Sequence, residues 1–300
     1  MLFSRSTIGI FLTLLAACCG VGTGLIVKMI GDDLSLLAVL MYRFIFSVPL
    51  LVILGFAFRG RHFLQINQKG TLAVRIIIGC FAMACWFTSV RLLPLGQATA
   101  LGQSSVIFVT VLSPMLLGEL IGRYRWTAVI VGMLGIVLLT NPFDGGFSVN
   151  VIYGLVGAVA AAILTILLRR LGKSDHPLSV AVWYNGVGMI FMIGIVALHP
   201  DQLFHVTRDQ LVILVALGVV ASCLQASMTT AFRFSDAVVI STLRYLQIPL
   251  AALVAFLMFN EILSPTEIAG GGIVIISCVV IAWRDFVRSR RAREITDAGT

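Results

Sequence analysis

Long apolar stretches alternate with short polar segments along the whole chain. Ten of these stretches approach the length, about 20 residues, that an α-helix needs to cross the ~30 Å hydrocarbon core of a bilayer. Because lipid offers the backbone no hydrogen-bond partners, each stretch is predicted to be helical, and the chain to be an all-α, polytopic membrane protein. The predicted spans are 7–28, 34–57, 71–90, 97–118, 126–141, 150–168, 178–199, 211–232, 236–259 and 266–284.

The composition agrees with this fold class. Of the 300 residues, 59% are hydrophobic and 11% are charged, and the mean hydropathy is +1.06. Soluble domains carry about 25% charged residues, so a soluble fold is excluded. All 6 cysteines fall inside predicted spans and lack the spacing of metal ligands, so we expect no metal site and no cofactor.

The basic residues concentrate on alternate loops. If the N-terminus is inside, 15 of the 21 Lys and Arg residues lie in cytoplasmic segments, and only Lys28, Arg91 and Arg208 lie in outside loops. The positive-inside rule then predicts that both termini are cytoplasmic. The net charge of +8 thus reports membrane topology, so we expect the lipid bilayer, and no nucleic acid, as a partner.

The chain contains an internal repeat. Three pairs of residues at matching places in the two halves are separated by 142 positions: Lys28 with Arg170, Arg43 with Asn185, and Glu119 with Glu261. Five spans per copy is an odd number, so the second copy enters the membrane from the opposite side. Such inverted repeats are typical of alternating-access transporters with a site at the midplane, and a channel is the alternative. We predict a first repeat over 1–145, a second over 146–286 and a basic cytoplasmic tail over 287–300.

Two arginines lie deep inside predicted spans. A charge at the bilayer centre costs about 2.5–3.5 kcal/mol on insertion scales, and no Asp or Glu lies at similar depth to pair with Arg43 or Arg244. Either a substrate supplies the negative group, or carbonyls and polar side chains satisfy the arginines. We favour a substrate for Arg244, which shares a face with small residues, and a structural role for Arg43, whose repeat counterpart is neutral. Arg75 lies nearer the inner membrane face and is expected to snorkel to it.

Other residues are candidates for the wall of a substrate cavity. Neutral amides would supply hydrogen bonds, and aromatic rings offer faces on which flat or cationic groups stack, although ordinary packing is the commoner role of such rings. These candidates are Gln103, Asn185, Gln225, Trp86, Tyr184 and Tyr245.

The fourth and ninth spans carry further features in common. Pro114 and Pro249 each remove a backbone hydrogen bond and predict a helix break. Glu119 and Glu261 end these spans at opposite membrane faces, where they serve either as gates or as solvated helix ends.

Four motifs carry a resemblance to a known family. They are YRFIFSVPLLVIL at 42–54, LPLGQATAL at 93–101, LLGELIGRYRWTAVIVGMLGIVLL at 116–139 and LRYLQIPLAALVAFLMFNEILSP at 243–265. The chain resembles the drug/metabolite transporter superfamily, specifically its EamA type with two five-helix repeats. The likeness covers essentially residues 7–285.

The resemblance implies a permease of the bacterial inner membrane that works by alternating access on amino acids, related metabolites, cofactors or toxic compounds. Arg43-Phe44 matches the family's RF, and Glu119 and Glu261 match its glutamates. Arg244-Tyr245-Leu246 resembles a branch that includes cofactor-type and adenosylmethionine permeases. Relatives often carry SP where this chain has Ser105-Val106, so the expected break in the fourth span is shifted toward Pro114.

The predicted function is secondary transport of a small organic metabolite, amino-acid-like and anionic or zwitterionic. A cofactor or adenosylmethionine uptake permease is the alternative within this class. An enzyme is not expected, because all four histidines lie at loops or helix ends and no central acid pair exists. The substrate, the direction, the coupling ion and the oligomeric state, a homodimer among the alternatives, stay open.

Overall fold

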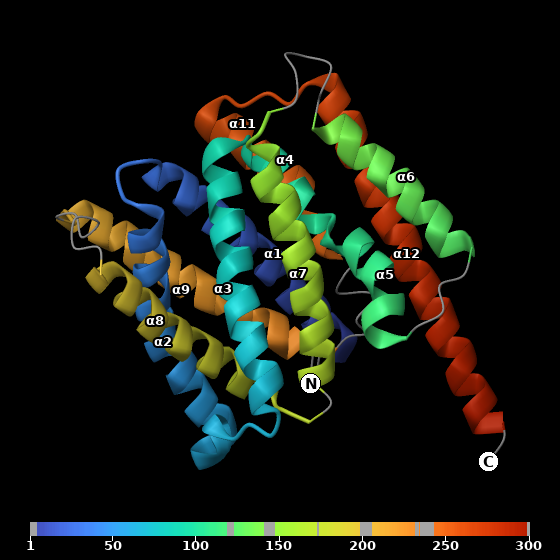
Figure 1. Cartoon of the computed structure of the whole chain (residues 1–300), viewed down its shortest axis with the longest axis horizontal. Helices are drawn as coiled ribbons and strands as arrows, with labels where there is room; N and C mark the ends of the chain where they lie inside the picture. Colours follow the sequence, from blue (N-terminus) through green and yellow to red (C-terminus); the bar gives the residue numbers. More distant parts are fainter. Residues whose placement is uncertain are drawn as a thin grey trace.

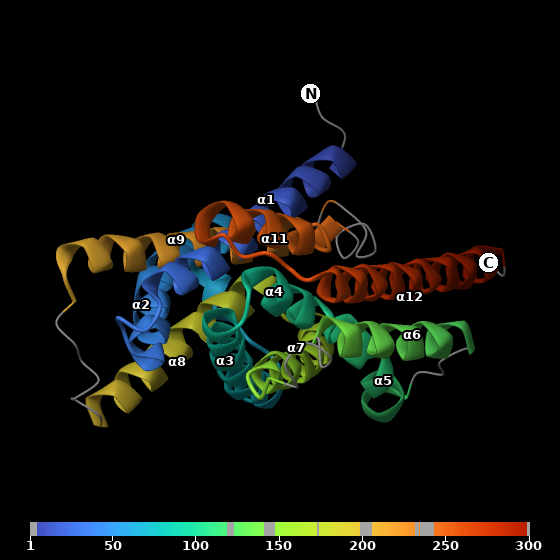
Figure 2. The same ribbon diagram turned by 90° about the horizontal axis from the view of Figure 1, so that it is seen from above.

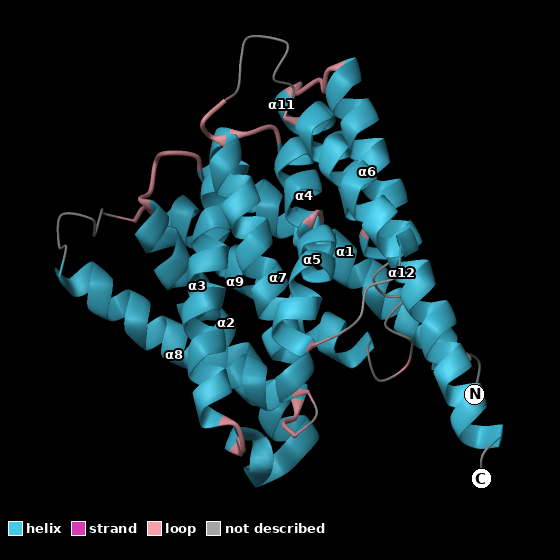
Figure 3. Cartoon of the chain, turned by 45° about the vertical axis from the view of Figure 1, so that its right-hand side comes forward, coloured by secondary structure: helices cyan, strands magenta, loops and turns pink. Residues whose placement is uncertain are grey.

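A computed structural model describes residues 5–118, 123–140, 148–172, 174–198, 206–231, 234 and 243–298. Within these ranges the chain forms helices and no strand (Figures 1 and 3). Seven helices are long and apolar enough to cross a membrane, and three shorter apolar helices complete the set. The predicted all-α fold with ten spans is therefore confirmed.

The first repeat supplies five spans, of which the fourth is built from two helices. A 3-10 turn, η1 (Gly60–Leu64), follows the second span. The helices are α1 (Arg5–Ile30), α2 (Leu36–Arg59), α3 (Lys69–Leu92), α4 (Leu95–Gln103), α5 (Ser105–Leu117) and α6 (Arg123–Leu139).

The second repeat supplies the other five spans. Its last helix continues well beyond the predicted end of the tenth span at 284. The ninth span was predicted to begin at 236, and residues 236–242 lie outside the described ranges. The helices are α7 (Val151–Leu171), α8 (Pro177–Leu198), α9 (Arg208–Ala231), α11 (Gln247–Phe259) and α12 (Pro265–Ala298).

The fourth span of each repeat ends in the same way. Gly118 ends α5 with a φ of 68°, and Asn260 ends α11 with a φ of 53°. Both residues occupy the left-handed region that terminates helices, and they are 142 positions apart in the sequence. The repeat predicted from side chains is thus also present in the backbone.

The two repeats interleave rather than forming separate halves. On one side α1 packs along α9 and contacts α11, and on the other α7 packs along α3 and contacts α4 (Figure 2). Each of these layers therefore joins the first span of one repeat to the third and fourth spans of the other. Helices α4 and α11 meet across the layers, α2 packs against α8, and α6 packs against α12.

Small residues allow the closest helix contacts. A Cβ atom on Gly270 of α12 would lie 2.3 Å from the backbone nitrogen of Leu139 and 2.7 Å from the carbonyl oxygen of Gly135 on α6. Lipid gives helices no hydrophobic reason to associate, so close packing of this kind contributes much of the stability. By contrast, a Cβ on Gly272 would meet nothing within 4 Å.

We predict that Gly270→Ala destabilises the protein, because the new methyl group must push two backbones apart. Overpacking of this kind costs about 1–3 kcal/mol. Thermal unfolding of the detergent-purified protein measures the effect. Gly272→Ala, two positions along the same helix, is the matched control and should be neutral or slightly stabilising, since alanine favours helix. Equal effects of the two substitutions would contradict the packing described here.

Candidate functional site

The interrupted fourth and ninth spans meet inside the protein. Helix α4 ends at Gln103, and α11 begins at Gln247 after a turn at 245–246. The Gln103 Nε2 atom donates a hydrogen bond of 2.8 Å to Gln247 Oε1, and both side chains are buried. One break from each repeat therefore lies at this junction.

The position of the first break corrects our expectation. We predicted a break at Pro114, but α5 runs through Pro114 to Leu117, and the interruption lies at Ser104. Its hydroxyl donates to the carbonyl oxygen of Leu101 at 2.5 Å, and its backbone nitrogen donates to the same oxygen at 3.1 Å. Pro114 lies in the last turn of α5, where the helix ends soon after. Pro249 is the third residue of α11, just after the ninth-span turn.

Arg244 and Tyr245 immediately precede α11. Arg244 is partly buried, and no carboxylate of the described residues forms an ion pair with it. Tyr245 is buried beside Cys278 of α12. The N-terminal end of a half-helix carries partial positive charge, which adds to that of the guanidinium. This junction therefore favours a negatively charged group.

Glycines of α1 make room for the residues at the junction. A Cβ on Gly20 would lie 3.0 Å from Gln247 Nε2. The Trp86 indole lies between Gly24 of α1 and Gly102 of α4, 3.5 Å from a Cβ built on either one. Trp86 thus packs beside the helix that carries Gln103, in a slot that larger residues would fill.

Asn185 and Gln225 form a second amide pair. Asn185 Nδ2 donates 2.9 Å to Gln225 Oε1 and 2.8 Å to the carbonyl oxygen of Ala181. This pair joins α8 to α9. Asn185 is fully buried, and its Oδ1 atom has no hydrogen-bond partner within the described part of the chain.

A group of two arginines and two aromatic rings lies where α2, α3 and α8 meet. The Arg75 guanidinium lies 3.9 Å from the centroid of the Tyr184 ring, and that of Arg43 lies 4.7 Å from the Phe44 ring. The two rings contact edge to face at 5.5 Å. Arg75 is only 5% exposed, so our expectation that it snorkels to the membrane surface is wrong. The Tyr184 ring covers it instead.

The charge of these two arginines is only partly compensated. Burying an unpaired ion costs several kcal/mol, whereas a desolvated cation–π contact returns about 2 kcal/mol. Nε and Nη1 of both Arg43 and Arg75 are buried without a hydrogen-bond partner, and no carboxylate of the described residues forms an ion pair with either. The group, which we call the Arg43–Arg75–Tyr184 cluster, is therefore a second positive region.

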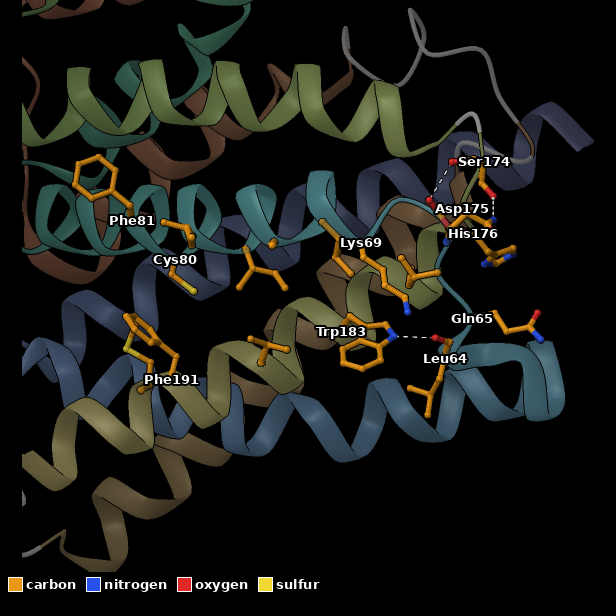
Figure 4. Close-up of a pocket in the computed structure, with 18 of the residues that line it drawn as sticks. Leu64, Gln65, Lys69, Cys80, Phe81, Ser174, Asp175, His176, Trp183 and Phe191 are labelled. Carbon is orange, nitrogen blue, oxygen red and sulfur yellow. Dashed lines mark hydrogen bonds between the residues drawn. The ribbon is translucent and has the colours of Figure 1, made fainter.

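A large pocket of about 1280 Å³ lies between α3 and α8 (Figure 4). Lys69 and Asp175 line one end of it, while Cys80, Phe81 and Phe191 line the other. None of the predicted substrate-binding residues lines this pocket. Sequence reasoning missed it because its wall joins two spans that are distant in the chain.

Lys28, Glu261 and the backbone at 93–95 join three segments at one end of the bundle, and we call this group the latch. Lys28 of α1 forms an ion pair with Glu261, just after α11, and donates 2.7 Å to the carbonyl oxygen of Leu93. Glu261 Oε2 also accepts 3.0 Å from the backbone nitrogen of Leu95. Its counterpart Glu119 lies outside the described residues.

Inverted repeats whose interrupted spans meet in a buried polar junction define a membrane protein of the transporter class. The chain belongs to the EamA-like transporter family, whose sequence profile matches residues 7–141 and 149–283. The two matches cover both repeats.

Several curated relatives are transporters. The chain is 28% identical to the pseudopaline exporter of Pseudomonas aeruginosa over 70% of this chain and 74% of the relative. It is 25% identical to the S-adenosylmethionine uptake transporter of Rickettsia prowazekii over 86% of both chains. It is 26% identical to an uncharacterized transporter of Helicobacter pylori over 93% of this chain and 96% of the relative.

A solved crystal structure has the same fold. It superposes with a TM-score of 0.62 over 92% of this chain and 97% of that one. The sequence identity is 15%, so this likeness concerns the fold alone.

We predict that Glu261→Gln lowers the free energy of unfolding of the protein by about 1–3 kcal/mol. The reason is that Lys28 would keep a partly buried charge without its counter-ion. Thermal unfolding measures this loss. The exchange Lys28→Glu with Glu261→Lys restores opposite charges and should recover part of it. If Glu261→Gln leaves the unfolding temperature unchanged, the ion pair between Lys28 and Glu261 contributes nothing to the stability of the folded state.

Proposed function

We propose that this protein is a secondary transporter that moves a small organic metabolite across the bacterial inner membrane by alternating access. The cargo is amino-acid-like and anionic or zwitterionic. The observation that carries the proposal is the junction of the fourth and ninth spans, where α11 begins at the Gln103–Gln247 pair and Arg244 lies three residues before Gln247 in the sequence. A substrate carboxylate would pair with Arg244, and the amides would orient its remaining polar groups.

A difference between two equivalent interfaces supports alternating access. The second span of one repeat meets the third span of the other on both sides of the molecule. At α2 and α9 this interface is tight: Ser47 Oγ donates 3.1 Å to the Gly218 carbonyl, and Ser222 Oγ donates 3.2 Å to that of Ser47. At α8 and α3 the equivalent interface holds the 1280 Å³ pocket. Exchanging these two arrangements would open one side of the protein and close the other.

The proposed orientation follows from charge. Lys69 and Arg59 lie at the polar end of the pocket, which is the cytoplasmic end if both termini are inside. The pocket then opens toward the cytoplasm, and the latch between Lys28 and Glu261 closes the opposite side. Glu261 acts as a gate residue in this proposal, since its two hydrogen-bonded partners come from different segments.

An S-adenosylmethionine-type permease is the second candidate. The likeness to the Rickettsia prowazekii uptake transporter extends over most of both chains. S-adenosylmethionine combines an amino-acid group, which an arginine could bind, with a flat purine, which could stack on an aromatic residue such as Trp86. Since the relatives include both an exporter and an uptake transporter, the test must work in either direction.

We predict that counterflow in proteoliposomes accepts carboxylate-bearing solutes and that Arg244→Gln selectively loses them. The panel should contain anionic, zwitterionic, neutral and cationic solutes, with S-adenosylmethionine among them. Removing one partner of a buried charge pair costs about 2 kcal/mol or more, so exchange should fall by about 30-fold or more.

Arg208→Gln is the matched control for this experiment, because Arg208 is exposed at the start of α9. It should leave exchange unchanged. If only solutes that lack a carboxylate exchange, and Arg244→Gln only lowers stability, Arg244 has a structural role and the proposed substrate class is wrong.

A further inference from the structure

We propose that the Arg43–Arg75–Tyr184 cluster binds one small anionic group, either a free inorganic anion or the acidic group of a bound solute. This site is separate from the junction at Arg244, because α11 packs on α1 and α4, whereas the cluster lies among α2, α3 and α8. The inference does not require that Arg244 bind the transported solute.

The first argument is the number of free donors. Arg43 and Arg75 are 2% and 5% exposed, and each has two buried nitrogens, Nε and Nη1, without a hydrogen-bond partner in the described ranges. Buried polar groups are almost always satisfied in native proteins. Four donors on two neighbouring cations call for an acceptor that carries negative charge.

The second argument is the orientation of the aromatic contacts. Arg75 lies over the Tyr184 ring at 3.9 Å, and Arg43 over the Phe44 ring at 4.7 Å. A ring attracts a guanidinium through its face, so these contacts fix the two side chains while leaving N–H groups at the guanidinium edges free to donate. The Tyr184 hydroxyl donates to the Gly79 carbonyl oxygen at 3.3 Å and also interacts with the Arg43 side chain, whose Nε and Nη1 atoms stay unpaired. The cluster is therefore arranged in advance for a ligand.

The third argument is that the cluster lies next to the pocket. Cys80 lines the pocket between α3 and α8, and its thiol also lies within electrostatic range of both Arg43 and Arg75 (Figure 4). The cluster thus lies behind the wall of the pocket at Cys80. Lys69, at the other end, would attract anions to the entrance.

Anion-dependent stability tests this proposal without any transport measurement. The full-length protein in detergent is unfolded thermally at constant ionic strength while chloride, or in a second series acetate, replaces a bulky sulfonate. A ligand of the folded state alone raises the unfolding temperature, here by about 5 °C when the anion reaches about 100 times its Kd. Arg75→Gln should abolish this rise.

The control is Arg91→Gln, at the other end of α3. Arg91 also has buried nitrogens without a partner, but Asp32 lies near it, so this substitution should preserve the rise. Arg75→Lys keeps the charge and loses the planar guanidinium. If Arg75→Gln does not fold, the anion-dependent rise in unfolding temperature is measured on Arg75→Lys instead. Arg75→Lys should weaken the apparent anion affinity about tenfold.

The two anions distinguish the source of the ligand. A response to chloride alone supports a free inorganic anion, and a response to chloride and acetate supports a site that also accepts the acidic group of a solute. The proposal is overturned if neither anion raises the unfolding temperature, or if Arg75→Gln and Arg75→Lys respond as the wild type does. Failure of the Arg244 counterflow experiment would leave this result unaffected.

Discussion

The backbone of a membrane-spanning chain finds no water with which to form hydrogen bonds, and the structure follows from that constraint. All the described spans are helical, and the interruptions at Ser104 and at 245–246 both lie next to other helices. A break that faced lipid would leave peptide groups unpaired at several kcal/mol each. Irregular backbone, and the polar side chains that accompany it, are therefore confined to the interior. The Gln103–Gln247 pair lies there for this reason.

The same scarcity of polar partners separates two kinds of charged residue. Lys28 lies near the end of a span and is paired with Glu261. Arg43 and Arg75 lie inside the bundle and have aromatic rings as neighbours instead of carboxylates. A transporter must release what it binds, and a permanent ion pair would occupy the donors that a ligand needs. Within the described residues, the interior arginines thus have no carboxylate partner, whereas Lys28 and Glu261 at the edge join separate segments.

Hydropathy predicted most of the fold, because the need to cross a bilayer acts on each stretch of sequence locally. The repeat was also accessible, since residues such as Lys28 and Arg170 keep their spacing. Contacts between spans that are distant in the sequence could not be predicted in this way. Distance along α3 suggested that Arg75 reaches the surface, but Tyr184 of α8 determines its environment. Gln247 was overlooked because nothing in the sequence marks two residues 144 positions apart as contact partners.

The interleaving of the repeats bears on how such a chain could arise. Each layer takes its first span from one repeat and its third and fourth spans from the other, so a single five-span half holds only part of each layer. Two copies of one half, inserted in opposite orientations, would rebuild both layers as an antiparallel pair. Fusion into one chain makes that pairing permanent and removes the requirement that the two copies be identical. Arg43 and Asn185, equivalent by position and different in charge, illustrate the divergence that fusion permits.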